Sequence, residues 1–251
     1  MDHLLRATAN AEARHFWFRG FRAFVNPIIR YAAAHRNAPG TLRVLDCGCG
    51  TGSNLALLNQ AGRAFGFDIS AVGLALGRQV GRTLLACGSV AAAPFPTAAF
   101  DIVTSFDVLY SLDDRTERAA IGEMFRLLKP GGFAIVNVAA MESLRGDHSV
   151  LSHEIRRYSR SGLRDRLTAA GFRIERLTYT NFTLFLPMLA ARTLQRRRGL
   201  KAETEAQREI SVPPEPLNAA LTALLWLESL YLRVLNAPAG SSLLCLAKKP
   251  E

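Results

Sequence analysis

The stretch VLDCGCGTG, residues 44 to 52, joins a short apolar run to three glycines spaced one residue apart. The run LRVLD, residues 42 to 46, is typical of a buried strand, and NLALLNQAG, residues 54 to 62, predicts the helix that follows. Glycine tolerates a positive φ and lets a ligand approach the backbone, while the start of a helix offers unpaired N–H groups. In open α/β sheets, ligands bind beyond the carboxyl ends of the strands. The stretch therefore predicts a ligand-binding loop.

The alternation of strands and helices continues along the chain. A helix is expected within TERAAIGEMFRLLKPGG, residues 116 to 132, which has apolar residues at helical spacing and a Lys-Pro-Gly-Gly stop. Further strands are expected at 64–68, 83–87, 100–107, 131–139, 172–180 and 242–249. Such alternation indicates a mostly parallel sheet. We predict an α/β fold: a Rossmann-like seven-stranded sheet, mostly parallel with an antiparallel last strand, with helices on both faces, an N-terminal helix and a helical insertion before the last strand.

Length and composition set the domain organisation. The 251 residues and 49% hydrophobic content suffice for one large α/β domain. We expect a single domain over residues 1–251, with a helical cap at 1–40, a cofactor-binding core at 41–138 and a helical insertion at 181–240.

The insertion contains apolar and basic segments. Hairpin loops usually span about 2–5 residues, whereas some 60 residues separate the last two expected strands. The segment PLNAALTALLWLESLYLRVL, residues 216 to 235, contains Glu228 and Arg233, each of which costs about 2.5–3.5 kcal/mol near the centre of a bilayer. We therefore do not expect it to span a membrane. Four interpretations stay open: the insertion packs onto the sheet, covers the cofactor edge, lines an apolar acceptor pocket, or rests on an anionic membrane.

Charge and cysteine content restrict the partners and the compartment. A net charge of +10 indicates an anionic partner, either nucleic acid or a membrane surface. No nucleic-acid-binding module is recognisable, so DNA is not expected and RNA is disfavoured. The four cysteines, Cys47, Cys49, Cys87 and Cys245, form no C-x-x-C pair, and no secretory signal is visible at residues 1–15. We therefore expect a reduced, cytoplasmic protein without a metal site.

The motifs resemble one family. VLDCGCGTG resembles the first motif of the class I S-adenosylmethionine-dependent methyltransferases, and its G-x-G-x-G spacing differs from the nicotinamide fingerprint, which has glycine where Ser53 stands. Residues 94–112 resemble the strand-four region of that family, and LLKPGG, residues 127 to 132, resembles its segment before strand five. The resemblance covers roughly residues 41–138 and implies S-adenosyl-L-methionine as the cofactor.

The resemblance also implies cofactor-binding residues. Asp68 stands where the family holds both ribose hydroxyls with a carboxylate. The other expected cofactor residues are Asp46, Gly48, Cys49, Gly50, Ile69, Gly88, Ser89, Val90 and Phe106. Plainer interpretations stay open, in which Asp46 only caps the glycine turn and Asp68 only caps a helix. The family often has an Asp after strand three, where this chain has Cys87-Gly88-Ser89-Val90, so we expect weakened cofactor affinity.

A polar segment after the fifth strand supplies candidates for the methyl acceptor. Its H-x-x-R-R-Y-S, residues 153 to 159, resembles a segment common in one branch of these methyltransferases. His153 is the preferred general base because an imidazole titrates near neutrality, although a loop histidine bonded to the backbone is an equal alternative. The catalytic candidates are His153, His148 and Tyr110, the last standing where many relatives have His. The substrate-binding candidates are Trp17, Tyr110, Arg157 and Tyr158, and a merely solvated Arg157 is the alternative.

The same branch often begins with H-W-W-F-R-G-R-R, which HFWFRGFR, residues 15 to 22, matches with two Phe replacements. On a helix, Trp17, Phe21, Phe24 and Ile28 share one face and are expected in the core. Arg19 and Arg22 lie on another face, where we expect one of them to pair with the methionine carboxylate of the cofactor.

These features predict methyl transfer from S-adenosylmethionine to a small, hydrophobic or lipid-like acceptor, reached at or near a membrane. The alternatives are an RNA or protein methyltransferase and a non-catalytic binding protein of the same fold. The oligomeric state is not predicted.

Overall fold

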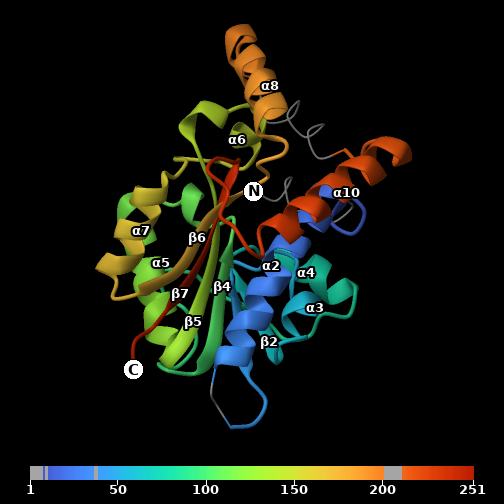
Figure 1. Ribbon diagram of the computed structural model, residues 1–251. Coiled ribbons are helices and arrows are strands. Elements are labelled where there is room, and N and C mark those ends of the chain that lie inside the picture. The colour runs from blue at the N-terminus through green and yellow to red at the C-terminus, as the bar shows by residue number, and fades with distance from the viewer. Residues whose placement is uncertain (1–7, 9–10, 37–38, 201–210) are drawn as a thin grey trace.

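The computed structural model describes residues 8, 11–36, 39–200 and 211–251. The described residues form a seven-stranded sheet in the order β3-β2-β1-β4-β5-β7-β6, and β7 runs antiparallel to both of its neighbours (Figure 1). The strands are β1 Arg43–Cys47, β2 Arg63–Asp68, β3 Leu85–Cys87, β4 Phe100–Phe106, β5 Leu128–Ala139, β6 Arg173–Thr180 and β7 Ser242–Lys248. The fold class predicted from the sequence is confirmed.

Helices cover both faces of the sheet. The face with α2 also carries α3 and α4, and α5 and α7 cover the other (Figure 1). The helices of the sheet domain are α2 Phe16–His35, α3 Leu55–Leu58, α4 Ala71–Gln79, α5 Asp114–Leu127, α6 Asp147–Leu151 and α7 Arg160–Ala169, with short 3-10 turns η1 at Leu109–Ser111 and η2 at Glu142–Leu144.

Two elements differ in length from their prediction. The helix expected at 54–62 is reduced to α3, because the side chain of Asn59 accepts a hydrogen bond from Ala64 N (2.9 Å) and the chain turns into β2. The Lys-Pro-Gly-Gly stop lies inside β5, which begins directly after α5 at Leu128.

The N-terminal helix α2 packs against the sheet through an apolar stripe. His15 caps it, because its Nδ1 accepts a hydrogen bond from Trp17 N (3.1 Å). Phe24 and Ile28 are buried as predicted, whereas Phe21 is half-buried and Trp17 is partly exposed. The helix begins at the carboxyl end of the strands, so the cap partly covers the edge where a ligand is expected (Figure 1).

The insertion folds into two helices, α8 Phe185–Arg198 and α10 Glu215–Tyr231, while β6 and β7 pair as if they formed a simple hairpin. Both helices extend from the carboxyl end of the sheet (Figure 1). α10 packs across α2 at Gly20, where an added Cβ would lie 2.4 Å from Leu225 Cδ1. Parts of the predicted cap and insertion, residues 1–7, 9–10, 37–38 and 201–210, lie outside the described residues. Within the described part of the chain, no helix has the length and hydropathy needed to cross a membrane.

Candidate cofactor and acceptor site

The glycine loop turns sharply after β1. Gly48, Gly50 and Gly52 have φ values of 78°, 55° and 76°, which disfavour any residue with a Cβ. Gly48 N and Cys49 N both donate to Phe67 O at the end of β2, at 2.9 and 3.0 Å. A Cβ on Gly48 would lie 2.4 Å from Cγ2 of Val108, which follows β4. The loop therefore closes tightly against the ends of two neighbouring strands.

Asp68 is the last residue of β2 and is fixed beside this loop. Its Oδ2 accepts from Gly50 N (2.7 Å) and its Oδ1 from Ser70 N (2.8 Å). Ser70, and not Asp68, caps α4, because its Oγ accepts from Gly73 N (3.1 Å). Each carboxylate oxygen accepts more than one hydrogen bond, so both remain able to accept from a vicinal diol.

Asp46 carries a buried oxygen that lacks a partner. The residue is 1% exposed, and its Oδ1 accepts from Thr104 Oγ1 on β4 (2.7 Å). Its Oδ2 has no hydrogen-bond partner among the described residues. Burial raises the pKa of Asp46 to about 7; the Thr104 hydrogen bond lowers it and the charge of Asp68 raises it further. Buried polar atoms are nearly always hydrogen-bonded, so Oδ2 fits a ligand that brings its own donor.

The N-terminal segment is tied to the glycine loop by contacts that the sequence patterns do not indicate. Glu12 is buried, and its carboxylate accepts from Thr51 Oγ1 (3.0 Å) and Arg82 Nη2 (3.1 Å). Arg22 donates from Nη2 to the backbone oxygen of Glu12 (2.7 Å). Burial lowers the pKa of Arg22, and Arg19 is exposed. The cap thus brings Arg22 close to the loop, while pairing of Arg19 or Arg22 with a cofactor carboxylate stays a prediction. Nothing in the local sequence distinguishes a buried acid such as Glu12 from an exposed acid in a polar segment.

The other predicted cofactor residues gather at the same edge. Ile69 follows Asp68 and is 72% exposed. The turn containing Gly88, Ser89 and Val90 lies beside β2, because Gly88 N donates to Asp68 O (3.0 Å). Phe106 ends β4 and packs edge-to-face on Phe21 with ring centroids 5.1 Å apart. Cys49 is buried inside the glycine loop.

An acid that the sequence analysis did not select follows β4. Asp107 has a φ of 60°, and two contacts with Asn137 hold it there: Asp107 N donates to Asn137 O and Asn137 Nδ2 donates to Asp107 Oδ1, each at 2.9 Å. Its side chain remains open to solvent at the carboxyl edge. Desolvation by the surrounding protein raises the pKa of Asp107 to about 7, and because the residue is exposed, contact with solvent limits this rise. The Asn137 hydrogen bond lowers the pKa, the charge of Glu154 raises it and the charge of Arg157 lowers it. The sequence could have identified Asp107, because it is an acid that follows the fourth strand inside the segment that resembles the family.

Tyr110, by contrast, is buried. It is 7% exposed, and its backbone oxygen accepts from Ile155 N (2.9 Å). Burial raises the pKa of Tyr110 well above its ordinary value, so the phenol keeps its proton. This environment suits a wall of the site better than a base.

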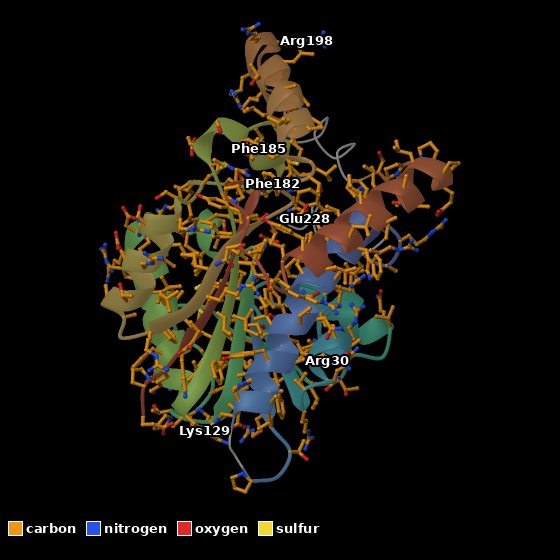
Figure 2. The ribbon with its side chains drawn as sticks, viewed as in Figure 1. Arg30, Lys129, Phe182, Phe185, Arg198 and Glu228 are labelled. Atoms are coloured by element: carbon orange, nitrogen blue, oxygen red, sulfur yellow. The ribbon has the colours of Figure 1, made fainter. Side chains whose placement is uncertain are left out.

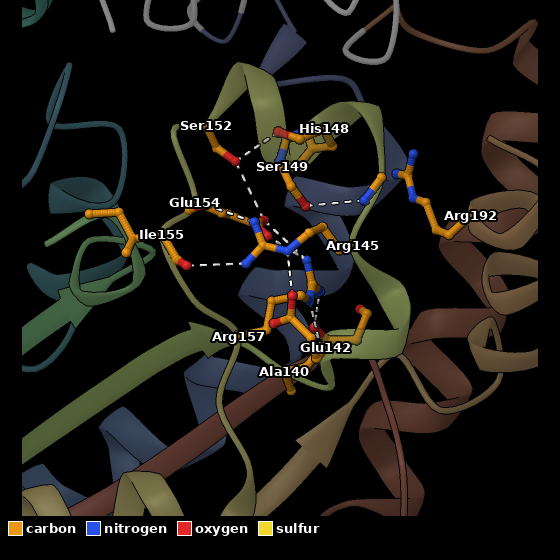
Figure 3. A network of polar contacts seen from close by, with 12 residues as sticks. Ala140, Glu142, Arg145, His148, Ser149, Ser152, Glu154, Ile155, Arg157 and Arg192 are labelled. Carbon is orange, nitrogen blue, oxygen red and sulfur yellow. Dashed lines mark hydrogen bonds and ion pairs between the residues drawn. The ribbon is translucent and has the colours of Figure 1, made fainter. Parts of the chain in front are cut away.

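The loop after β5 forms a polar network (Figure 3). Arg157 donates from Nε to Ala140 O (2.8 Å), from Nη1 to Glu154 Oε2 (2.8 Å) and from Nη2 to Ser241 O (3.0 Å). Its side chain is 6% exposed. Arg157 therefore fastens the end of β5 to the start of β7, and a direct contact with an acceptor stays a prediction.

The two candidate histidines belong to α6 and to the turn that follows it. His148 is in α6, and its backbone oxygen accepts from Ser152 Oγ (2.7 Å; Figure 3). His153 is exposed, has a φ of 52° and lines an open hollow of about 410 Å³ with Arg145 and Leu200.

Tyr158 lies apart from the cofactor loop. It is buried, and its hydroxyl donates to Glu117 Oε1 of α5 (2.5 Å). The structure therefore gathers the predicted cofactor residues at one edge. Of the acceptor candidates, Tyr110 and Arg157 meet at the loop after β5, whereas the Tyr158 hydroxyl bonds to α5.

A doubly wound sheet of this strand order, with one acid just before the glycine loop and a second acid at the end of β2, is typical of a domain that binds a nucleotide-like ligand. Residues 45–136 match the family described as a methyltransferase domain. The chain is 29% identical over 165 residues to a probable S-adenosylmethionine-dependent methyltransferase of Mycolicibacterium smegmatis, which covers 64% of this chain and 61% of that protein. The chain therefore contains a methyltransferase domain over residues 45–136 and is similar to S-adenosylmethionine-dependent methyltransferases.

Other relatives carry a more specific name. A probable tRNA methyltransferase 9B of Bos taurus is 31% identical over 152 residues, 57% of this chain and 32% of that protein. The chain thus spans about a third to three fifths of the length of these curated relatives. Among solved structures, an S-adenosylmethionine-dependent methyltransferase from Mesorhizobium loti shares the fold with a TM-score of 0.53 at 19% identity, covering 88% of this chain and 96% of that one.

The cofactor of this family is S-adenosylmethionine, and the residues present fit it. Asp68 offers two braced oxygens for a ribose diol, and the unpartnered oxygen of Asp46 suits an ammonium group.

Proposed function

We propose that this protein transfers the methyl group of S-adenosylmethionine to a small, hydrophobic acceptor. The observation that carries the proposal is the pair of acids at the carboxyl edge, Asp68 with both oxygens braced and Asp46 with a buried oxygen lacking a partner. When bound, the cofactor supplies an electrophilic methyl group. The protein then has to hold the cofactor, orient the acceptor, exclude water and receive a proton where the acceptor loses one.

Titration calorimetry tests the first part of this proposal. Binding of S-adenosylmethionine and of its demethylated product, both weakened by Asp68→Ala, is the expected result. A folded protein that binds neither contradicts the proposal. Binding without turnover on any acceptor would favour the non-catalytic alternative.

Asp107 is the group that we assign to proton removal. Asp107 directly precedes Val108, whose side chain lies against Gly48. Asp107 is therefore next to the cofactor loop, and it is exposed to solvent. Asn137 donates to one carboxylate oxygen of Asp107, and the residue is exposed to solvent. A carboxylate that titrates near neutrality suits a general base. The predicted base His153 lies in the loop hollow and remains the alternative.

Two substitutions separate the two bases. Asp107→Asn should lower kcat by about 100-fold or more, within the usual range for a general base, while leaving the dissociation constant of the cofactor unchanged. His153→Ala should leave kcat near that of the wild type. The reverse pattern would assign the base to His153.

The class of acceptor rests on the insertion. Its exposed apolar side chains flank the carboxyl edge, which favours a hydrophobic or lipid-like acceptor over a polar one. RNA is the second candidate, supported by the relatives named tRNA methyltransferases and by the net charge of +10. A tritiated-methyl assay on lipid extract and on total tRNA, each with and without ribonuclease, decides between them. Label in the organic phase that resists ribonuclease supports the first candidate; ribonuclease-sensitive label supports the second.

We also propose that the protein works in the cytoplasm, next to a membrane. The four cysteines are unpaired, which suits a reducing compartment. Fractionation of cells that express the tagged chain, with and without a salt wash, tests this location.

A further inference from the structure

Exposed apolar side chains are concentrated in the insertion. Fourteen large hydrophobic residues are exposed among the described residues, and ten of them lie between 181 and 240. These ten are Phe182, Leu186, Leu194, Leu200, Leu217, Trp226, Leu227, Tyr231, Val234 and Leu235. Clusters of exposed apolar side chains on a folded protein mark interaction surfaces, because a partner that covers them removes apolar area from water.

Helix α10 has two distinct faces. Its inner face packs on α2 and includes Leu225, which is fully buried. Glu228, its one charge between Leu217 and Leu232, is also buried, since its carboxylate accepts from Phe182 N (2.8 Å) and Thr183 N (3.0 Å). The outer face is therefore apolar and without charge, which a water-facing helix normally avoids.

The outer face of α10 includes Trp226, Leu227 and Tyr231, which are 52%, 57% and 42% exposed. Val234, three residues after the end of the helix and next to the exposed Arg233, is 83% exposed. The aromatic residues Trp226 and Tyr231 are of the type found at membrane–water boundaries.

Helix α8 is also divided into two faces. One face is held to the loop after β5, because Arg196 Nη1 donates to Arg145 O (2.8 Å). The opposite face presents Leu186, Ala190 and Leu194 to solvent and lines an open hollow of about 440 Å³. Arg197 and Arg198 are exposed at the tip, farthest from the sheet (Figure 2).

We propose that the outer faces of α8 and α10 form a docking surface for an anionic lipid bilayer. The apolar side chains enter the boundary between headgroups and acyl chains, and Arg197 and Arg198 contact lipid phosphates. A second copy of the chain is a poorer occupant, because it would bring two molecules of charge +10 and their arginine tips together. The surface lies at the carboxyl edge of the sheet, so docking turns the acceptor side of the enzyme towards the lipid (Figure 1).

The orientation of the acceptor side towards the lipid rests on the proposed function. Binding to the bilayer does not depend on that function. Flotation with vesicles tests the binding, using phosphatidylcholine alone and phosphatidylcholine mixed with phosphatidylglycerol. We expect flotation with the anionic vesicles, weakened by salt. In a Trp17→Phe background, the fluorescence of Trp226 should shift to the blue on the same vesicles.

Matched variants locate the surface. Arg197→Gln with Arg198→Gln should reduce partitioning roughly 30-fold, and Leu227→Glu should reduce it roughly tenfold or more. Two controls should bind as the wild type does: Arg30→Gln, exposed at the opposite end of the molecule, and Val80→Glu, an exposed apolar residue outside the insertion (Figure 2). Equal loss in the variants and controls, or no flotation of the wild type, overturns the proposal.

Two further measurements complete the test. If Leu227→Glu converts a dimer to a monomer in sedimentation without changing flotation, a second copy covers this face and the proposal is wrong. The dissociation constant of S-adenosylmethionine should be unchanged in every docking variant. A failure of docking therefore leaves cofactor binding intact, whereas a failure of the proposed function shows first in calorimetry.

Discussion

Two buried aspartates on neighbouring strands show how this fold divides structure from function. Asp46 lies near the carboxyl end of β1 and Asp101 near the amino end of β4, and each is 1% exposed. Asp101 accepts from Arg43 N (2.9 Å), from Lys129 Nζ (2.9 Å) and from Arg36 Nε (3.2 Å). Asp46 has one donor and a bare second oxygen.

Their electrostatics differ in the same way. Burial alone would raise the pKa of Asp101, but the Arg43 hydrogen bond and the Lys129 and Arg36 cations outweigh burial and leave the pKa below its ordinary value. Burial dominates at Asp46, whose pKa is raised. An ionised acid that the protein itself satisfies stabilises the fold, whereas one left unsatisfied costs stability and is retained where a ligand completes it.

The largest expected effect is on stability, at Asp101. Asp101→Asn should lower the free energy of unfolding by about 3 kcal/mol, because it leaves Arg36 and Lys129 without their counter-charge. Urea denaturation at neutral pH measures this loss. The wild-type contribution is present above the unfolded pKa and is lost as the pH falls through the lower folded pKa. Cofactor affinity should not change; an equal loss in affinity would mean that the two ends of the sheet are not independent.

Asp46→Asn should show the opposite pattern. The charge-assisted contact with the cofactor is worth about 2 kcal/mol, so the dissociation constant of S-adenosylmethionine should rise about 30-fold. The cofactor-free variant should be as stable as the wild type at pH 8 or more stable, because no buried charge remains to be desolvated. Calorimetry and thermal unfolding of the same samples measure both quantities. A variant that simply unfolds would make Asp46 a structural residue.

The sequence predicts the carboxyl edge well because the residues there act through the backbone. Gly48, Gly50 and Asp68 are read from two short segments, each made of a strand and the turn after it. Strand and turn signals are local, so their positions were correct to within a few residues. The antiparallel direction of the last strand was also predicted, and this strand pairs with β6 across the insertion.

Contacts between distant segments were not predictable in this way. Glu12 meets Arg82 seventy positions along the chain, and Asp107 meets Asn137 thirty positions along. Neither acid differs locally from a solvated one, and only the strand order brings its partner close. Arg157 illustrates the converse, since its position in a family-like segment suggested substrate binding while the structure surrounds it with backbone carbonyls.

The pH dependence of cofactor binding sharpens the difference between the two acids. The folded pKa of Asp46, about 7, lies above the ordinary value of 3.8. The folded protein therefore holds this proton more tightly, and Asp46 reduces stability progressively as the pH rises from about 4 to 7. An ammonium ligand needs the carboxylate, so the dissociation constant should rise severalfold as the pH falls from 8 to 6.

Calorimetry across this range should show the dependence in the wild type and in Asp107→Asn, but not in Asp46→Asn. Asp107 titrates in the same window, and for that reason it is the necessary control. If the pH dependence of cofactor binding is lost in Asp107→Asn and kept in Asp46→Asn, the contact with the cofactor would be assigned to Asp107, which follows β4.

The smallest expected effect comes from Thr104, whose hydroxyl makes the one hydrogen bond to the Asp46 side chain within the described part of the chain. Thr104→Val keeps the side-chain shape but removes that donor, which is worth about 1 kcal/mol. Because the bond favours the ionised acid, the pH midpoint of cofactor binding should move upward by about half to one unit. Thr178→Val is the matched control: Thr178 is equally buried but bonds Ala237 N and not Asp46. An unchanged midpoint in Thr104→Val would mean that a group other than Asp46 titrates. The comparison with Asp101 would then give no evidence that Asp46 binds the cofactor.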